Sequence, residues 1–190
     1  NKLSHWVEYS IVSEQNFKKR MEKFHYFVAL MQKLYSMNNF LDTAGIVGGF
    51  DSNAIFRLKF HHSQLSQQDR DFIDEMKVVF SPDKGFENLR AKQDAALLSN
   101  EPSLPYIGIL LSDLFKYDDA VALFVDGLIN CRKMKGLYNY ISKIEEFKRS
   151  MYCFLSIDQV QEKISQLDLH DEDVLYYMSK DIEKDGATSF

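Results

Sequence analysis

Large apolar residues recur at three- and four-residue steps along most of the chain, and this period is typical of helices rather than strands. The clearest stretch covers residues 17–35, where the spacing places six large side chains on one side of a helix: Phe17, Met21, Phe24, Val28, Met31 and Tyr35. We find no run with the period of two that marks a strand. The pattern predicts an all-α fold, a multi-helix globular domain.

Further helices are expected on either side of this one. A short helix over residues 3–11 precedes it, and after a break at Asn38-Asn39 come helices at residues 40–50 and 55–58. Ser66 and Asp69 resemble a capping box that opens the next helix, and Ser81-Pro82 starts another. Later helices are expected at residues 107–117, 120–147, 157–166 and 171–184. Two glycines inside the long helix over residues 120–147, Gly127 and Gly136, cost roughly 1 kcal/mol each relative to Ala, so we expect close packing or bending there.

Composition narrows the class of protein. The length of 190 residues suits one domain, and 45% hydrophobic residues with 15 Phe, 10 Tyr and 7 Met supply a substantial core. The net charge is -5, whereas a nucleic-acid binder usually carries a basic face. The basic cluster within residues 18–23 occupies the outer positions of a helix and is expected to be a solvated face. We therefore expect no nucleic-acid partner.

Cysteine content and apolar run length bear on the compartment. Cys131 and Cys153 are too few for a disulfide framework and lack a CxxC spacing, which favours a reducing, cytoplasmic setting. No apolar run reaches transmembrane length, and no signal-peptide pattern opens the chain, so no direct membrane insertion is expected.

Motifs of catalysis by covalent chemistry are absent from the sequence. It contains no GxxxxGK[ST], GxGxxG, HExxH or GxSxG. Its one histidine pair, His61-His62, is a poor metal site because adjacent helical residues point about 100° apart. We expect no metal, no cofactor and no covalent enzyme chemistry.

Four segments, taken together, are more specific. They are FHYFVALMQKLYSMNNFLDTAGIVGGFDSNAIFRLK from residue 24, SLPYIGILLSDLFK from residue 103, LINCRKMKGLYNYISKIEEFKRSMY from residue 128, and the closing LYYMSKDIE. In this order they resemble the catalytic domain of Ras-type guanine-nucleotide exchange factors, the Son-of-sevenless class. The resemblance covers nearly all of residues 1–190 but corresponds to roughly the last three quarters of the family domain, so we expect the family's opening helices to lie elsewhere in a larger protein.

Departures from the family pattern mark a divergent member. The Asn-Phe-Asn-like corner ends in Leu41, and His61 lies where the family has a threonine. Met151 replaces a proline, the final Glu-Pro is Glu183-Lys184, and the loop between the two hairpin arms looks short.

The resemblance implies a mechanism and its residues. In the family, two antiparallel helices project as a hairpin that displaces a switch region of the GTPase. Here the hairpin would span about residues 106–144. Matched residue by residue, Phe115 would occlude the magnesium site and Asp119 would lie near the phosphate-loop hydroxyl. The same matching makes Arg57, Ile55, Ser112 and Lys116 contacts to the GTPase.

Each assignment has an alternative. Phe115 could be a core residue one helical step from Leu111, and Asp119 could cap a helix that starts at Ala120. Arg57 could form an internal ion pair, and Ser112 with Lys116 could be a plain solvated face.

The resemblance leads us to expect an exchange factor for a Ras-family small GTPase, without covalent chemistry, that acts at the inner face of membranes and is recruited there by other domains. The alternative function is an inactive domain of the same fold that serves as a protein-binding scaffold. An enzyme of unrelated helical fold is a third class.

Overall fold

The computed structural model describes residues 2–167 and 170–184 and confirms the all-α class. Its elements, in chain order, are α1 (Lys2–Val12), α2 (Phe17–Ser36), α3 (Phe40–Asp51), α4 (Asn53–Phe56), α5 (Lys59–Gln64), α6 (Gln67–Val79), the 3-10 helix η1 (Asp83–Gly85), α7 (Glu87–Leu98), α8 (Ile107–Ala120), β1 (Phe124–Val125), β2 (Leu128–Ile129), α9 (Cys131–Glu146), α10 (Asp158–Ser165) and α11 (Glu172–Ile182).

The helical body forms around the apolar side of α2, as the spacing predicts. Phe24, Val28 and Met31 are at most 1% exposed and belong to one core cluster with residues of α1, α3, α6 and α7. The predicted apolar side of α2 includes one exposed residue. Phe17 is 41% exposed, and its ring contacts Phe60 at a centroid distance of 5.6 Å.

Local capping explains where several helices begin. The Ser66 side chain accepts a hydrogen bond from the backbone N–H of Asp69 at 3.0 Å, which is the N-cap half of the expected capping box, while the Asp69 carboxylate contacts His25. The break after α2 is also confirmed: Asn38 has a φ of 58°, and the Asn39 side chain caps α3 by accepting from Asp42 N at 3.0 Å. These short polar side chains end one helix and start the next within a few residues.

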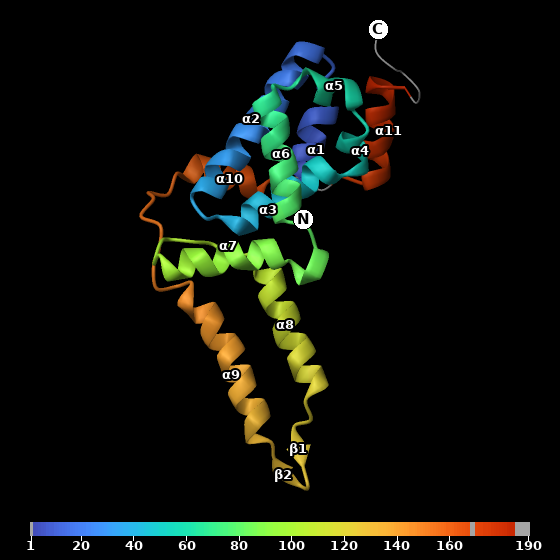
Figure 1. Cartoon of the computed structure of the whole chain (residues 1–190). Helices are drawn as coiled ribbons and strands as arrows, with labels where there is room; N and C mark the ends of the chain where they lie inside the picture. The colour runs from blue at the N-terminus through green and yellow to red at the C-terminus, as the bar shows by residue number, and fades with distance from the viewer. Residues whose placement is uncertain (1, 168–169, 185–190) are drawn as a thin grey trace.

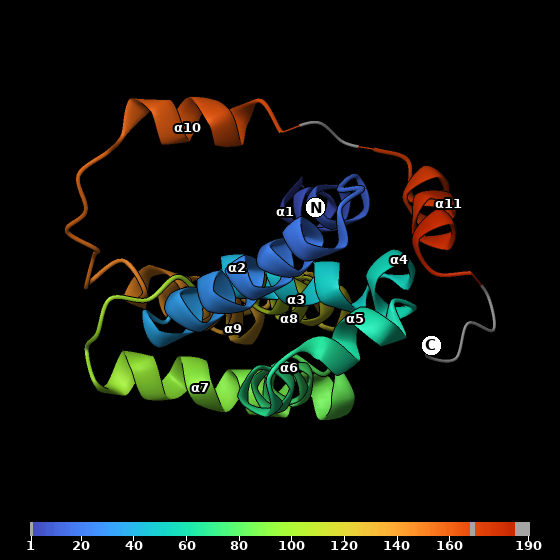
Figure 2. The ribbon, with the colours of Figure 1, turned by 90° about the horizontal axis from the view of Figure 1, so that it is seen from above.

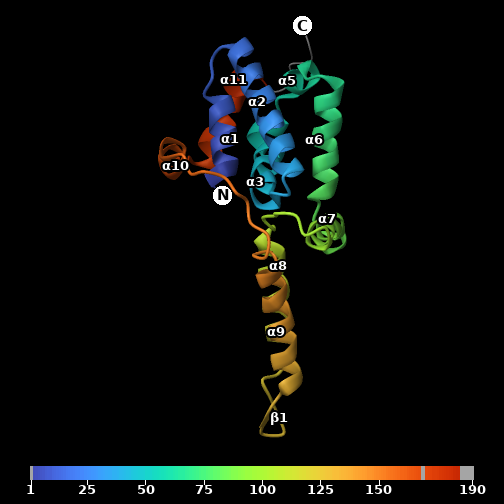
Figure 3. The same cartoon turned by 90° about the vertical axis from the view of Figure 1, so that its left-hand side faces the viewer.

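A hairpin projects from this body, and we use "hairpin" for residues 107–146, from α8 to α9. Figure 1 shows α7 lying across the end of the body, with α8 and α9 running away from it to the β1–β2 ribbon. Figure 3 shows the same projection from the side, with the two arms one behind the other.

The helix predicted over residues 120–147 is wrong in its first part. Its residues 124–129 instead form an antiparallel ribbon in which Phe124 pairs with Ile129 and Val125 with Leu128. The turn residues Asp126 and Gly127 both have positive φ, 50° and 76°. This is the backbone of an Asp-Gly hairpin turn, which matches the twist of the two strands and cannot continue a helix.

Of the last two helices, α10 is attached more loosely than α11, which contributes Leu175 to the core. In Figure 2, α10 lies apart from α1 and α2, while α11 lies beside α4. α10 is joined to α1 by a hydrogen bond from Lys2 Nζ to the Ser165 carbonyl at 3.3 Å. Among the described residues, none of the helices is both long enough and apolar enough to cross a membrane.

Candidate functional site

The outer face of α8 carries exposed residues that the sequence singled out. Phe115 is 73% exposed, and Ser112, Lys116 and Asp119 are exposed as well. Phe115 and Asp119 are four residues apart, so they lie on the same face one turn from each other. The core alternative for Phe115 is therefore wrong.

Asp119 is not a helix N-cap either. It lies in the last turn of α8, and the following helix begins at Cys131 behind Asn130, whose side chain accepts from the N–H groups of Arg132 and Lys133. Within residues 2–167 and 170–184, no cation pairs with the Asp119 carboxylate. An acid near a helix C-terminus faces the negative end of the helix dipole, so local helix stability does not account for it.

The neighbouring acid is held very differently. Lys133, only 7% exposed, reaches from α9 to donate to the Asp118 carbonyl and to pair with its carboxylate, both at 2.7 Å. A cation at the end of α8 neutralises the last carbonyls there and ties the two arms together. Asp119 is thereby left as an uncompensated negative charge beside a neutralised one.

The two arms approach closely at Gly136. The Tyr117 ring packs where a Cβ on this glycine would stand, with the hydroxyl oxygen 2.0 Å from that position. The Tyr117 hydroxyl also donates to the Arg132 carbonyl at 3.1 Å. This confirms the close packing expected at Gly136, whereas Gly127 is a turn residue instead.

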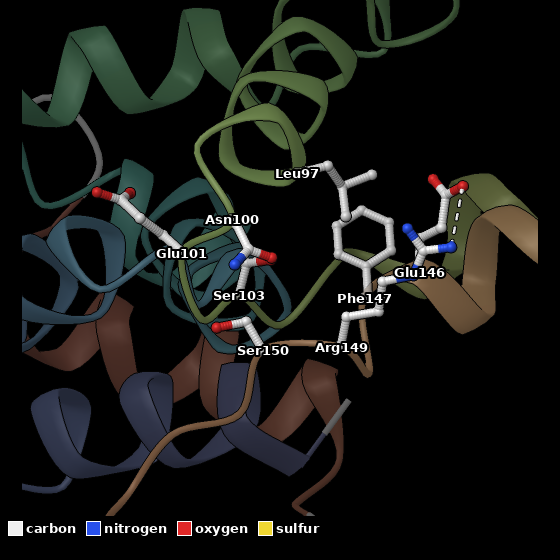
Figure 4. A pocket seen from close by; sticks show the side chains of 8 residues that line it. All are labelled: Leu97, Asn100, Glu101, Ser103, Glu146, Phe147, Arg149 and Ser150. Atoms are coloured by element: carbon white, nitrogen blue, oxygen red, sulfur yellow. Dashed lines mark ion pairs between the residues drawn. The ribbon is translucent and has the colours of Figure 1, made fainter.

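The root of the hairpin contains a small hollow of about 60 Å³ between the end of α7 and the end of α9. Figure 4 shows Leu97 of α7 and Phe147 lining it, with Arg149 paired to Glu146 nearby. The segment that leads into α8 is fastened to the body, because Leu104 exchanges backbone hydrogen bonds with Asn38 and Phe40.

The two candidates on α4 and its end lie in the body and not on the hairpin. Ile55 is 0% exposed, so direct contact with a partner is not available to it in this arrangement, and it serves as core. Arg57 is half-buried. It donates from Nη1 to the Ser179 carbonyl at 2.6 Å and lies 5.8 Å from the Tyr176 ring centroid. The structure therefore groups Phe115, Asp119, Ser112 and Lys116 but places Arg57 and Ile55 elsewhere.

A buried polar chain around His61 was missed by the sequence reasoning. Arg20 Nε donates to His61 Nε2 at 2.9 Å, so the ring proton is on Nδ1 and is donated to Glu183. Burial lowers the pKa of His61, opposed by the hydrogen bond to Glu183. This chain joins α2, α5 and the end of α11, which are far apart in sequence.

The adjacent His62 faces differently and donates to the Ile55 carbonyl at 3.1 Å. Burial lowers its pKa too. Across the described residues, no group of three or more His, Cys, Asp and Glu is arranged to hold a metal ion.

Comparison with known proteins gives the class. The sequence model of the RasGEF domain matches residues 1–135. The chain is 28% identical over 184 residues to "Ras guanine nucleotide exchange factor J" of Dictyostelium discoideum, covering 96% of this chain and 22% of that protein. It is 25% identical over 190 residues to "Ras guanine nucleotide exchange factor V" of the same organism, covering 100% and 9%.

A mammalian relative is similar to the same degree. "Ras-specific guanine nucleotide-releasing factor 2" of Rattus norvegicus is 29% identical over 189 residues, covering 96% of this chain and 15% of that protein. The chain thus spans about a fifth or less of the length of these relatives. The structure shows a helical domain with a projecting two-helix arm. The chain belongs to the RasGEF domain family.

Proposed function

We propose that this chain promotes the release of bound guanine nucleotide from a Ras-family small GTPase, with the hairpin as the element that opens the nucleotide site. Membership of the RasGEF domain family supports this, as do the names of the relatives. Because such GTPases are carried on membranes, the proposed site of action is the cytoplasmic face, with recruitment by other parts of a larger protein.

The observation that carries the proposal is the state of Phe115. A phenylalanine 73% exposed on a projecting arm leaves a large apolar surface in water, with no packing role in this chain. One turn further along the same face stands the unpaired carboxylate of Asp119. An apolar side chain cannot act as a ligand of a magnesium ion. A carboxylate repels the negatively charged phosphates.

The proposed mechanism follows from that chemistry. Guanine-nucleotide affinity depends on magnesium and on donors that cradle the phosphates. Phe115 would exclude the hydrated cation from its position, and Asp119 would compete with the phosphates for the same donors. The hairpin must then bind the empty GTPase more tightly than the loaded one, and by reciprocity incoming nucleotide expels the exchange factor.

The direct test is release of a fluorescent guanine nucleotide from Ras, Rap and Ral GTPases, each with excess unlabelled nucleotide. We expect the chain to accelerate release from at least one class, and Phe115→Ala and Asp119→Asn each to slow it. Leu98→Ala is the matched control, since Leu98 is an 88% exposed apolar residue on α7. Equal slowing by Leu98→Ala would remove the special role of Phe115.

Binding without acceleration is the outcome that favours the scaffold alternative. It would appear as stable association with nucleotide-free GTPase while the release rate stays at the intrinsic value. If the chain neither binds nor accelerates nucleotide release from any of the three GTPase classes, the proposed function is overturned.

A further inference from the structure

We propose that Arg90 is a positioning residue that fixes the angle of the hairpin against the body, so that Phe115 and Asp119 are presented in one orientation. The structural part of this inference stands on the contacts of α7 and α8. Its kinetic consequence rests on the proposed function.

One face of α7 is turned toward the hairpin root. The residues that make contact there recur at helical steps and so share a side of the helix. Three of them bond to the hairpin or to the residue just before it: Arg90, Gln93 and Asp94.

Arg90 forms the most specific of these contacts. Its guanidinium binds Asp113 of α8 through two parallel hydrogen bonds, Nη1 to Oδ2 at 2.5 Å and Nη2 to Oδ1 at 2.9 Å. Its Nε donates to the Gly85 carbonyl at 2.7 Å, which fixes the guanidinium plane itself. A bidentate pair of this kind constrains direction as well as distance. The Asp113 carboxylate also raises the pKa of Arg90, so the pair stays charged.

A second point on the same arm is fixed by Gln93. Its side chain is 2% exposed and accepts from the backbone N–H of Tyr106, the residue that precedes α8, at 2.6 Å. Tyr106 and Asp113 are seven residues apart, or roughly 10 Å along a helix axis. Two fixed points define the direction of α8. Phe115 and Asp119 lie beyond the second, so loss of the Arg90 pair would displace them most.

The second arm cannot supply the same constraint. Its ion pair to α7, Lys143 with Asp94 at 2.9 Å, has side chains 40% and 51% exposed, and an exposed pair contributes little. Where α9 ends near α7, Leu97 and Phe147 line the small hollow of Figure 4, and neither makes a directional polar contact like that of Arg90. The side chains of the Arg90–Asp113 pair are only 33% and 23% exposed. This pair therefore sets the angle of the hairpin relative to the body.

The first experiment measures the angle without any GTPase. Spin labels are placed at Leu128→Cys on β2 and Glu75→Cys on α6, both exposed positions, in a chain whose Cys131 and Cys153 are changed to Ser. Pulsed electron resonance should give one narrow distance distribution for this parent. Arg90→Met and Asp113→Asn should each broaden or shift it, and the exchanged pair Arg90→Asp with Asp113→Arg should restore it.

The matched control is Lys84→Met, which removes an exposed ion pair with Glu87 at the same end of α7 without touching the hairpin. It should leave the distribution unchanged. The inference is overturned if Arg90→Met and Asp113→Asn both give a distance distribution with the same width and centre as the parent's. It is also overturned if Lys84→Met broadens the distribution as much as Arg90→Met does.

The second experiment is kinetic. Arg90→Met should lower the maximal rate of nucleotide release between about tenfold and a hundredfold, the size of effect expected from small misplacement of a catalytic group. The GTPase concentration that gives half-maximal rate should change by less than about twofold, because the contact surface is intact. The exchanged pair should recover most of the rate. An equal loss in both kinetic constants with no rescue would assign Arg90 a merely structural role.

The two experiments separate the two proposals. If the parent accelerates no GTPase, the proposed function fails, while the spin-label distances still decide whether Arg90 sets the angle.

Discussion

The body and the hairpin use the same helical period of apolar residues in opposite ways. In the body, Phe24 on α2 is fully buried among the rings of Phe50, His61 and His62. Of residues 107–146, all of which the structure describes, the buried apolar side chains are Ile109 and Leu110, both in the first turn of α8. The body is held by apolar burial, whereas the hairpin leaves most of its large apolar side chains half-buried or exposed.

The hairpin is held by ion pairs and hydrogen bonds in place of a hydrophobic core. Asp113 and Asp118 are each bound by a cation from a neighbouring helix, and Gly136 lets the arms touch. Directional contacts can keep an arm straight without covering its surface. The residues that hold the hairpin in place are therefore different from those that form its exposed apolar stripe, so the stripe can stay uncovered.

The largest expected effect lies in the body. Phe24→Ala should lower the free energy of unfolding by about 3–5 kcal/mol, because it removes a fully buried ring and leaves a cavity. Urea denaturation of the variant and the parent measures this. A loss below about 1 kcal/mol would contradict the view that apolar burial in the body stabilises the domain.

Gly136→Ala should have the next largest effect and should act on the hairpin alone. The added Cβ collides with the Tyr117 ring, and relief by backbone shifts costs about 1–3 kcal/mol. Hydrogen exchange should show faster opening of α8 and α9 amides, with α2 unchanged. Combining Tyr117→Ala with Gly136→Ala should remove the collision and bring amide exchange in α8 and α9 back toward that of the parent. Equal acceleration in α2 would show that body and hairpin unfold as one unit.

Acid should destabilise the body through His61. Its pKa is lowered by burial, so below the ordinary value of about 6.5 the unfolded chain binds a proton that the native state resists. Stability is fully present above that pH and declines as pH falls, by at most about 1.4 kcal/mol per pH unit for one group. Melting temperatures between pH 7.5 and 5.5 measure the slope.

The control for the acid experiment is His61→Gln, which does not titrate but can bond both Arg20 and Glu183, the charged groups that face this ring. The variant should keep only part of the slope, because the pKa of His62 is also lowered by burial. An identical slope in parent and variant would exclude His61 as the source.

The smallest expected effect on stability is that of Phe115→Ala. This is the same chemical change as Phe24→Ala, yet the side chain is 73% exposed, so unfolding should shift by less than about 1 kcal/mol. Urea denaturation of the two variants side by side gives the contrast directly. A large loss for Phe115→Ala would return this residue to a packing role and remove the basis of the proposed wedge.

Local signals account for what was predictable along the chain. The apolar residues of α2 recur every three or four positions, and single side chains cap α3 and α6. Both signals act over a few residues, so they can be recognised in the sequence. The β1–β2 ribbon was legible too, because Asp126-Gly127 between Phe124-Val125 and Leu128-Ile129 is a strong hairpin signal. It was outweighed by the apolar residues around it, which fit a helical period equally well.

The helical class, most helix starts and the family motifs follow from local sequence. Which apolar residues are covered depends instead on how distant segments pack together. Ile55 and Phe115 are both large and apolar and sit at equally helical spacing, yet one is fully buried and the other 73% exposed. Burial depends on what packs against a face, and that partner comes from distant parts of the chain. The same reason explains the Arg90–Asp113 pair and the joining of Arg20, His61 and Glu183. Charge pairing across such separations is set by how helices pack, and no local pattern encodes it.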